Sequence, residues 1–203
     1  MQSKPLLWCI PALLLILVAG PAYSQAVYSA SEDRPRLSVG AGLSIFSQDW
    51  GHNPHPIGIT YTGDYHPPLL PGFLGDVNIE IQGRNLMWHR GATSVTGTPI
   101  VPRTFTIGGG LNYHPHWFRF HKFEPYAKGL VSYGSINFAP DDVPYNHDTR
   151  TVPSIGGGVD YRLIHRITLR ADYEYQWWPQ FLGPNALTPN GVTIGALYNL
   201  GHR

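Results

Sequence analysis

The stretch Ile167–Trp178 (ITLRADYEYQWW) alternates between apolar and polar residues along almost its whole length. One set of alternate positions is apolar or aromatic: Ile167, Leu169, Ala171, Tyr173, Tyr175 and Trp177. The other set is polar: Thr168, Arg170, Asp172, Glu174 and Gln176. Because successive side chains of a strand point to opposite faces, this is a strand with one apolar and one charged face. In a soluble barrel the apolar face fills the core, whereas in a membrane barrel it meets lipid and the charges fill the lumen.

Seven other segments alternate in the same way. They predict strands around residues 37–45, 57–65, 77–88, 104–114, 126–138, 152–163 and 191–200. Together with 167–178 they make eight strands, of about the length that a tilted strand needs to cross a bilayer. Four apolar residues fall on the polar side of the third and fifth strands: Leu86, Trp88, Tyr126 and Leu130. We therefore predict a β-bulge at Gly83 and a shift of parity near Gly134–Ser135.

The N-terminal region predicts export. Leu6–Gly20 is apolar, follows Lys4 and leads into small residues, which is typical of a signal peptide over residues 1–24 rather than an uncleaved anchor. Residues 25–35 are polar and predict a periplasmic lead-in, and residues 36–203 predict the barrel domain. The single cysteine, Cys9, lies in the predicted signal, so we expect neither disulfides nor cysteine metal sites in the mature chain. Cleavage of the signal peptide would remove Lys4 and leave equal numbers of acidic and basic residues. A net charge of zero argues against nucleic-acid binding.

The connections between the predicted strands differ on the two sides of the sheet. On one side they span residues 47–56, 89–103, 139–151 and 179–190. On the other side they span residues 66–76, 115–125 and 164–166. Longer loops on one side and generally shorter turns on the other are typical of outer-membrane barrels.

Three motifs carry a resemblance to a known family: PYAKGLVSYG (125–134), SIGGGVDYRL (154–163) and the ending TIGALYNL (193–200). With the predicted signal peptide, they make the mature chain similar to the OmpA-like small outer-membrane β-barrels. The resemblance implies an all-β fold, an eight-stranded antiparallel up-and-down transmembrane β-barrel, and location in the bacterial outer membrane. We expect the chain to lack the periplasmic peptidoglycan-binding domain of longer members. The resemblance also implies contact with the barrel assembly machinery through an assembly signal made of Thr193, Gly195, Tyr198 and Leu200.

Charged residues at inward positions predict a network in the lumen. They are Asp64, Glu80, Arg84, Lys128, Asp160, Arg162, Arg170, Asp172 and Glu174. Side chains about fill an eight-stranded barrel, and buried charges must be paired. Five acids and four bases nearly balance, so we interpret them as salt bridges that fill the lumen rather than as an ion path.

Outward aromatic residues near strand ends predict the girdles that amphipathic rings form at the lipid headgroups. They are Tyr61, Tyr65, Tyr113, Tyr161, Tyr175 and Trp177, with Tyr198 of the assembly signal. The alternative is a soluble barrel, in which these aromatic side chains would point inward and form the core.

The sequence predicts no catalytic, metal or cofactor site. Asp49, His52 and His55 share one loop, and His114, His116 and His121 surround a turn. Loop histidines without cysteines or a helical HExxH motif are typically solvated. No GxSxG elbow is present, and the glycine runs 108–110 and 156–158 lie within strands, where glycine relieves crowding rather than cradling phosphate.

The sequence therefore favours an outer-membrane barrel with a structural or surface-interaction role. Outer-membrane lipids surround it, and loops 89–103 and 179–190 are the candidate contact surface for an unidentified ligand. Three alternatives remain: an outer-membrane lipid-modifying enzyme, a small pore, and a soluble secreted carrier barrel of the lipocalin type, which would need an apolar interior.

Overall fold

The computed structural model describes residues 35–49, 55–67, 76–88, 101–137, 147–180 and 186–200. The predicted signal peptide and nearly all of the predicted lead-in lie outside these residues. Within the described ranges, no helix is long and apolar enough to cross a membrane.

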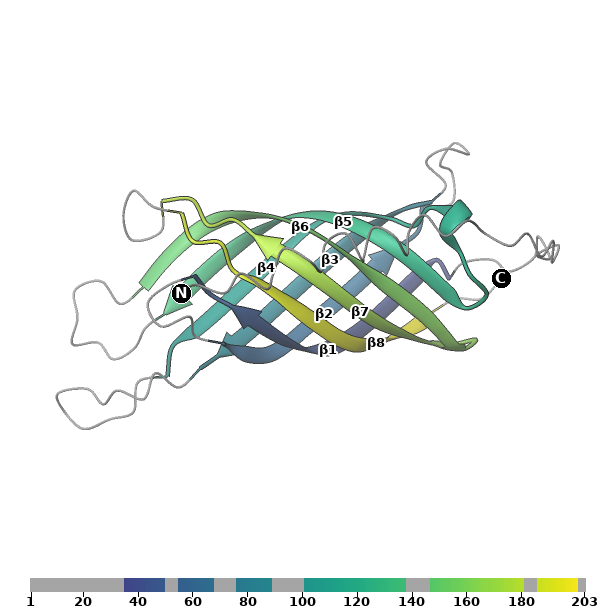
Figure 1. Cartoon of the computed structure of the whole chain (residues 1–203), viewed down its shortest axis with the longest axis horizontal. Helices are drawn as coiled ribbons and strands as arrows, with labels where there is room; N and C mark the ends of the chain where they lie inside the picture. Colours follow the sequence, from purple (N-terminus) through teal and green to yellow (C-terminus); the bar gives the residue numbers. More distant parts are fainter. Residues whose placement is uncertain are drawn as a thin grey trace, which may run out of the picture. The chain divides into compact units, whose positions relative to one another are not determined.

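Eight antiparallel strands close into one barrel, in which each strand pairs with its neighbours in the chain and β8 pairs with β1 (Figure 1). The strands are β1 (Leu37–Ser47), β2 (Ile57–Tyr65), β3 (Val77–Met87), β4 (Arg103–Tyr113), β5 (Phe123–Asn137), β6 (His147–Ile164), β7 (Ile167–Gln176) and β8 (Asn190–Leu200). A short 3-10 helix, η2 (His116–Phe118), lies between β4 and β5. This confirms the predicted eight-stranded antiparallel barrel. The end of the barrel that carries the connections after β1, β3, β5 and β7 is called the loop end, and the opposite end is called the turn end.

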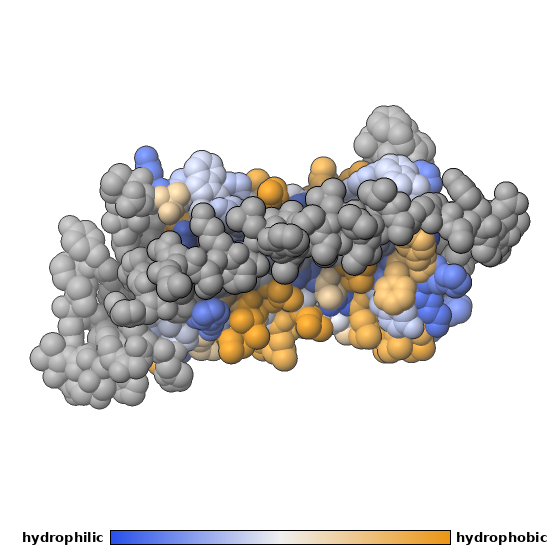
Figure 2. Space-filling view, in the orientation of Figure 1, coloured by the Kyte–Doolittle hydropathy of each residue, from blue (hydrophilic) through white to orange (hydrophobic). Residues whose placement is uncertain are grey.

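The apolar face of the strands points outward and the polar face points inward. Leu43, Ile155 and Ile194 are 68%, 69% and 66% exposed, whereas their inward neighbours Ser44 and Thr193 are buried. Figure 2 shows apolar side chains gathered over the flank of the barrel that this view presents. The barrel is therefore inverted relative to a soluble protein, which is the arrangement of membrane barrels.

The strands β5 and β6 extend beyond their predicted ends. Their ladder runs from Phe123 opposite Tyr161 to Asn137 opposite His147. It converts the second part of the predicted loop 139–151, and the end of the predicted link 115–125, into strand. Backbone hydrogen bonds can continue a hairpin where the side-chain alternation that marks the strand in the sequence has ended.

The predicted bulge at Gly83 and the predicted parity shift near Gly134–Ser135 are wrong. The pairing of β3 and of β5 with both of their neighbours runs through these positions without a shift. Among the described strand pairs, the register shifts only between Arg162 and Ile164 of β6. The four apolar residues that seemed out of place point into the lumen and are buried: Leu86, Trp88, Tyr126 and Leu130.

The inward apolar residues near the loop end pack together. Trp88, Ile136, Val152, Trp178 and Leu187 form one buried cluster, here called the apolar cap. The segment after β7 contributes Trp178 and Leu187, which pair through two backbone hydrogen bonds of 2.8 and 3.0 Å. Gly134 leaves room for the Trp178 ring, since a Cβ atom there would lie 2.5 Å from Trp178 Cη2. Inward positions, which are polar elsewhere in the strands, are thus apolar where the side chains bury one another inside the barrel.

Candidate functional site

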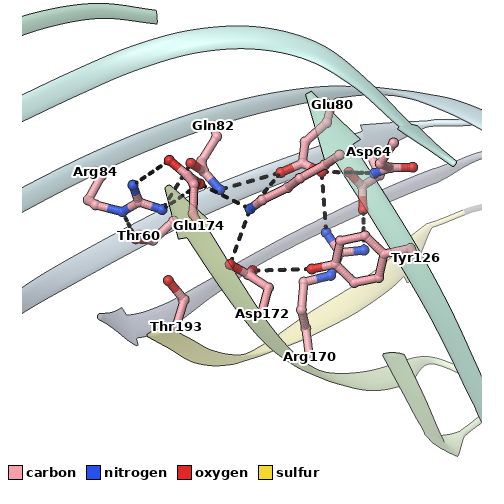
Figure 3. Close-up of polar contacts among 12 residues, drawn as sticks. Thr60, Asp64, Glu80, Gln82, Arg84, Tyr126, Arg170, Asp172, Glu174 and Thr193 are labelled. Carbon is pink, nitrogen blue, oxygen red and sulfur yellow. Dashed lines mark hydrogen bonds and ion pairs between the residues drawn. The ribbon is translucent and has the colours of Figure 1, made fainter. Parts of the chain in front are cut away.

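Charged and polar side chains fill the lumen between the apolar cap and the turn end. Figure 3 shows that polar side chains of β2, β3, β5 and β7 point toward one another. Eight buried residues carry formal charges: Asp64, Glu80, Arg84, Lys128, Asp160, Arg170, Asp172 and Glu174. Each is less than 9% exposed, so their charges are stabilised by one another and by neutral hydrogen-bond donors rather than by bulk water.

The part of the network next to the cap is centred on Arg84 and Glu174. Arg84 Nη1 and Nη2 donate to the two carboxylate oxygens of Glu174 at 2.9 and 3.0 Å. Arg84 Nε donates to Thr60 Oγ1 at 2.8 Å, and the guanidinium lies 4.3 Å from the centre of the Phe46 ring. This two-pronged geometry is the strongest form of an ion pair between arginine and a carboxylate. Gln176 Nε2 adds a third donor to Glu174, at 2.9 Å.

Lys128 joins three carboxylates. Its Nζ lies 3.2 Å from Asp172 Oδ1, 3.2 Å from Glu174 Oε2 and 3.7 Å from Glu80 Oε1. The lysine side chain passes Gly156, where a Cβ atom would lie 3.2 Å from Lys128 Cε. The glycine at this inward position makes room for the backbone of β7, since a Cβ atom would lie 2.5 Å from the carbonyl oxygen of Tyr173, and also for the lysine.

The part of the network nearer the turn end is centred on Arg170. Its Nε and Nη2 donate to Asp160 at 2.7 Å each, and Nη2 lies 2.8 Å from Asp64 Oδ2. The guanidinium also lies 4.6 Å from the centre of the Tyr126 ring. Tyr126 in turn donates its hydroxyl hydrogen to Asp172 at 3.2 Å. Through Tyr126 and Asp172, the Arg170 cluster is continuous with the Lys128 cluster.

Neutral donors compensate for an excess of carboxylates. Inside the barrel, five buried acids face three buried bases, not the near balance that the sequence predicted. Asn112 Nδ2 donates to Asp64 Oδ1 at 3.1 Å and to Glu80 Oε2 at 2.9 Å. The amide of Asn112, the amide of Gln176 and the hydroxyl of Tyr126 therefore supply hydrogen bonds that further cations would otherwise provide.

Arg162 stands apart from the other predicted lumen charges. Its side chain is 26% exposed, and its Nη2 pairs with Glu124 Oε1 at 2.9 Å. Glu124 lies in the part of β5 that the sequence pattern assigned to a connection, which is why sequence reasoning missed it. Asn112, Tyr126 and Gln176 were missed as members of the network, although Asn112 and Gln176 share inward parity with predicted members of the network.

A polar cavity lies at the turn end of the lumen. It is lined by Pro35, Ser38, Asp64, His66, Asn78, His114, Glu124, Asp160, Arg162, Thr168, Arg170, Leu197 and Asn199. His114 follows the last residue of β4 and stacks on Tyr126, with ring centres 5.1 Å apart. Burial, with a further contribution from Arg170, lowers the pKa of His114 to about 3, so its ring is neutral at physiological pH. The charged lining shows that the interior does not suit the apolar ligand of a lipocalin-type carrier.

The predicted girdle residues all lie on outward positions, but not all lie at strand ends. Tyr65, Tyr175 and Tyr198 stand near the ends of their strands and are 44%, 40% and 43% exposed. Tyr113 and Tyr161 also lie close to the turn end, and Trp177 follows the end of β7. Tyr61 is different, because it stands in the middle of β2, opposite Ala41 and Gly83. The small outward residues on both neighbouring strands leave space for its ring in the lipid-facing wall.

The residues of the predicted assembly signal divide between the two faces of β8. Thr193 points inward, and its hydroxyl lies 2.9 Å from that of Ser44. Gly195 also points inward, where a Cβ atom would lie 2.7 Å from the Cα of Gly42 on β1. Tyr198 and Leu200 point outward. The outward pair is thus available to another protein or to lipid, whereas Thr193 and Gly195 are used in closing the barrel.

The described histidines His114, His116 and His121 do not share one site. His114 is buried in the lumen, while His116 and His121 lie exposed on the β4–β5 connection. His116 Nδ1 bonds Asp76 Oδ2 at 2.7 Å. His52 lies outside the described residues. Within the described ranges, no group of three or more histidine, cysteine, aspartate or glutamate side chains is arranged to hold a metal ion.

Residues 10–199 match the family model of the outer membrane protein beta-barrel domain. The structure is similar to that of Neisserial surface protein A, with a TM-score of 0.59 and 13% sequence identity over 83% of this chain and 100% of that one. It is also similar to Ail, the attachment invasion locus protein of Yersinia pestis, in complex with the heparin analogue sucrose octasulfate (TM-score 0.57, 15% identity, 82% and 99% of the two chains). OprG from Pseudomonas aeruginosa gives a TM-score of 0.52 and 14% identity over 81% and 95%. No curated protein sequence matches the chain.

Replacing Arg170 with methionine should destabilise the barrel by about 3–5 kcal/mol, because Asp160 and Asp64 would lose their buried partner. Arg162→Met is the matched control, since it breaks a partly exposed pair that should contribute at most about 1 kcal/mol. Urea unfolding of both variants in the same lipid vesicles measures the difference. Equal stabilities of the two variants would contradict the central place given to Arg170.

Proposed function

This chain belongs to the outer membrane protein beta-barrel family, and we propose that it is a closed, non-conducting barrel with a structural or surface-interaction role. Proteins of this family are located in the bacterial outer membrane. The observation that carries the proposal is the filled lumen. The apolar cap occupies the loop end, and the Arg84–Glu174 and Arg170–Asp160 pairs occupy the space below it. A barrel filled in this way offers no continuous aqueous path for a solute.

Because the filled lumen does not favour transport, we place the function of the protein on the connections that project from the membrane. Outer-membrane barrels carry longer loops outside the cell and shorter turns in the periplasm. The loop end is accordingly the extracellular one, with loops 89–103 and 179–190 as the proposed contact surface. The wall would stay in contact with outer-membrane lipids, and β8 would have met the barrel assembly machinery.

The ligand of Ail in its complex does not transfer readily to this chain. A sulfated ligand requires a basic surface, because its binding depends on charge neutralisation. In the connections at the loop end, Asp49, Asp141 and Asp142 outnumber the single basic residue Arg90. We therefore propose a surface contact without a preference for polyanions.

Planar-bilayer recordings test the closed lumen. The wild-type protein should show no stable, large, porin-like conductance, and Trp178→Ala should also show none, because the charged network below the cap stays in place. A stable porin-like conductance of the wild-type protein would overturn the proposal.

Cysteine labelling in intact cells tests the orientation. Arg103 at the loop end and Lys122 at the turn end are both exposed basic residues beside strand ends, which makes them a matched pair. In a Cys9→Ser background, a membrane-impermeant maleimide should react with the Arg103→Cys variant in intact cells and with the Lys122→Cys variant only after lysis. Labelling of the turn-end position in intact cells would show the opposite orientation.

One contact favours a second candidate function, hydrolysis of a lipid ester. Ser135 Oγ lies 3.2 Å from His147 Nε2, and both residues occupy outward positions near the loop end. A histidine nitrogen at this distance can accept the proton of a serine nucleophile. A hydrolase also needs a group that orients the histidine and donors for the oxyanion, so the pair alone is a weaker basis than the filled lumen.

A lipid-product assay separates the two functions. Purified protein in vesicles of outer-membrane lipid should release no more fatty acid than its Ser135→Ala variant. Release that depends on both Ser135 and His147 would replace the structural role by the enzymatic one.

A further inference from the structure

The connection between β4 and β5 and the first residue of β5 expose four aromatic side chains. Trp117, Phe118, Phe120 and Phe123 are 59%, 45%, 57% and 48% exposed. Three of them lie outside the strands, so the alternation of the wall does not account for their exposure. Large apolar side chains gathered on a surface mark a place that contacts something other than water.

Polar contacts hold this connection in place. Asp76, just before β3, accepts hydrogen bonds from the backbone N–H of His116 at 3.1 Å and from Arg119 Nη2 at 3.2 Å. Two backbone hydrogen bonds of 2.9 and 3.0 Å join Phe120 and Phe123 around a tight turn in which His121 has a φ of 55°. The polar groups are thus used within the connection, while the aromatic rings remain exposed.

The aromatic rings continue the lipid-facing wall. The Trp117 ring contacts Tyr113 edge-on with centres 6.1 Å apart, and the Phe123 ring lies 4.8 Å from that of Tyr161. Tyr113 and Tyr161 belong to the outward faces of β4 and β6. These two ring contacts join the aromatic side chains of the connection and of the start of β5 to the lipid-facing wall.

The neighbouring β6–β7 turn adds apolar and basic side chains. The register shift in β6 leaves the consecutive residues Leu163 and Ile164 45% and 56% exposed. The backbone N–H of Arg162, near the end of β6, donates to the carbonyl of Lys122 at 2.9 Å, which joins this end of β6 to the β4–β5 connection. In Figure 1 the teal coil of η2 and the green β6–β7 turn lie at the same end of the barrel.

The exposed charges on the two connections are basic. Lys122 and Arg166 are exposed, whereas the nearby carboxylates Asp76 and Glu124 are 13% and 16% exposed and are paired with Arg119 and Arg162. Aromatic rings beside lysine and arginine are the combination that binds a lipid interface. The rings enter the headgroup layer, and the cations attract anionic phosphate groups.

We propose that the β4–β5 connection and the β6–β7 turn form a platform that seats in the leaflet at the turn end and binds anionic phospholipid. Trp117, Phe118, Phe120 and Phe123 enter the headgroup layer, and Lys122 and Arg166 contact lipid phosphates. This interaction fixes the depth of the barrel at the turn end. It does not depend on any function of the loop end.

Tryptophan quenching tests the depth. The full chain is folded in phosphatidylcholine vesicles whose acyl chains are brominated near the headgroup, and the Trp117→Phe variant is compared with wild type. The contribution of Trp117, taken as the difference between the two, should be quenched by the brominated lipid and protected from aqueous acrylamide. Trp177→Phe, which removes an outward tryptophan at the loop end, is the matched control. Quenching of Trp117 by acrylamide alone would overturn the proposal and leave the platform as a contact for a periplasmic protein.

The charge dependence is tested in vesicles of phosphatidylcholine with and without phosphatidylglycerol. The wild-type urea midpoint should be higher in the anionic vesicles, and Lys122→Gln with Arg166→Gln should lose at least half of that difference. Lys122→Arg keeps the charge and should retain the difference, which separates the loss of charge from a general loss of stability. The same difference in the glutamine variant as in wild type would overturn the phospholipid assignment.

Discussion

Closure of the wall is the constraint on which the rest of the structure depends. In hydrocarbon no water is present to bond a free strand edge, so all backbone groups of the sheet must pair within the protein. The pairing of β8 with β1 removes the last edge. Once eight strands close, the inward side chains share a narrow space, and any charge placed there must find its partner across the lumen.

The inward side chains meet this constraint differently at three levels of the barrel. At the loop end Trp178 and its neighbours exclude water by apolar packing. In the middle, Arg84, Lys128 and Arg170 each serve more than one acceptor, and neutral donors such as Asn112 supply what the cations do not. At the turn end a charged cavity carries Arg162 on its lining, where partial exposure reduces the cost of its charge. From the loop end to the turn end, the inward side chains therefore change from apolar residues to buried ion pairs and then to a partly exposed pair.

The two ends therefore present different chemistry. At the loop end the apolar cap occupies the lumen, and the connections around it are rich in acidic and neutral residues. The turn end combines an accessible charged cavity with exposed aromatic and basic side chains around its rim. This asymmetry suits a barrel with one end in the periplasm and the other outside the cell, because only one end meets a phospholipid leaflet.

The sequence by itself determined the strand count and the common face of residues such as Glu80 and Arg170, because a period of two residues fixes which side chains share a face. Whether that face points into the barrel was decided by the structure, in which Leu43 and Ile194 are exposed on the outer wall. The sequence did not determine which charges pair, since Arg84 and Glu174 lie 90 residues apart and meet only when the barrel closes. Nor did it identify the apolar cap. In the sequence, apolar residues at inward positions, such as Trp88, interrupt the alternation of polar and apolar residues, and only the structure shows that they pack together in the lumen. Alternation is a local property of one strand, whereas pairing across the lumen depends on the register of all eight, and only the tertiary structure decides that.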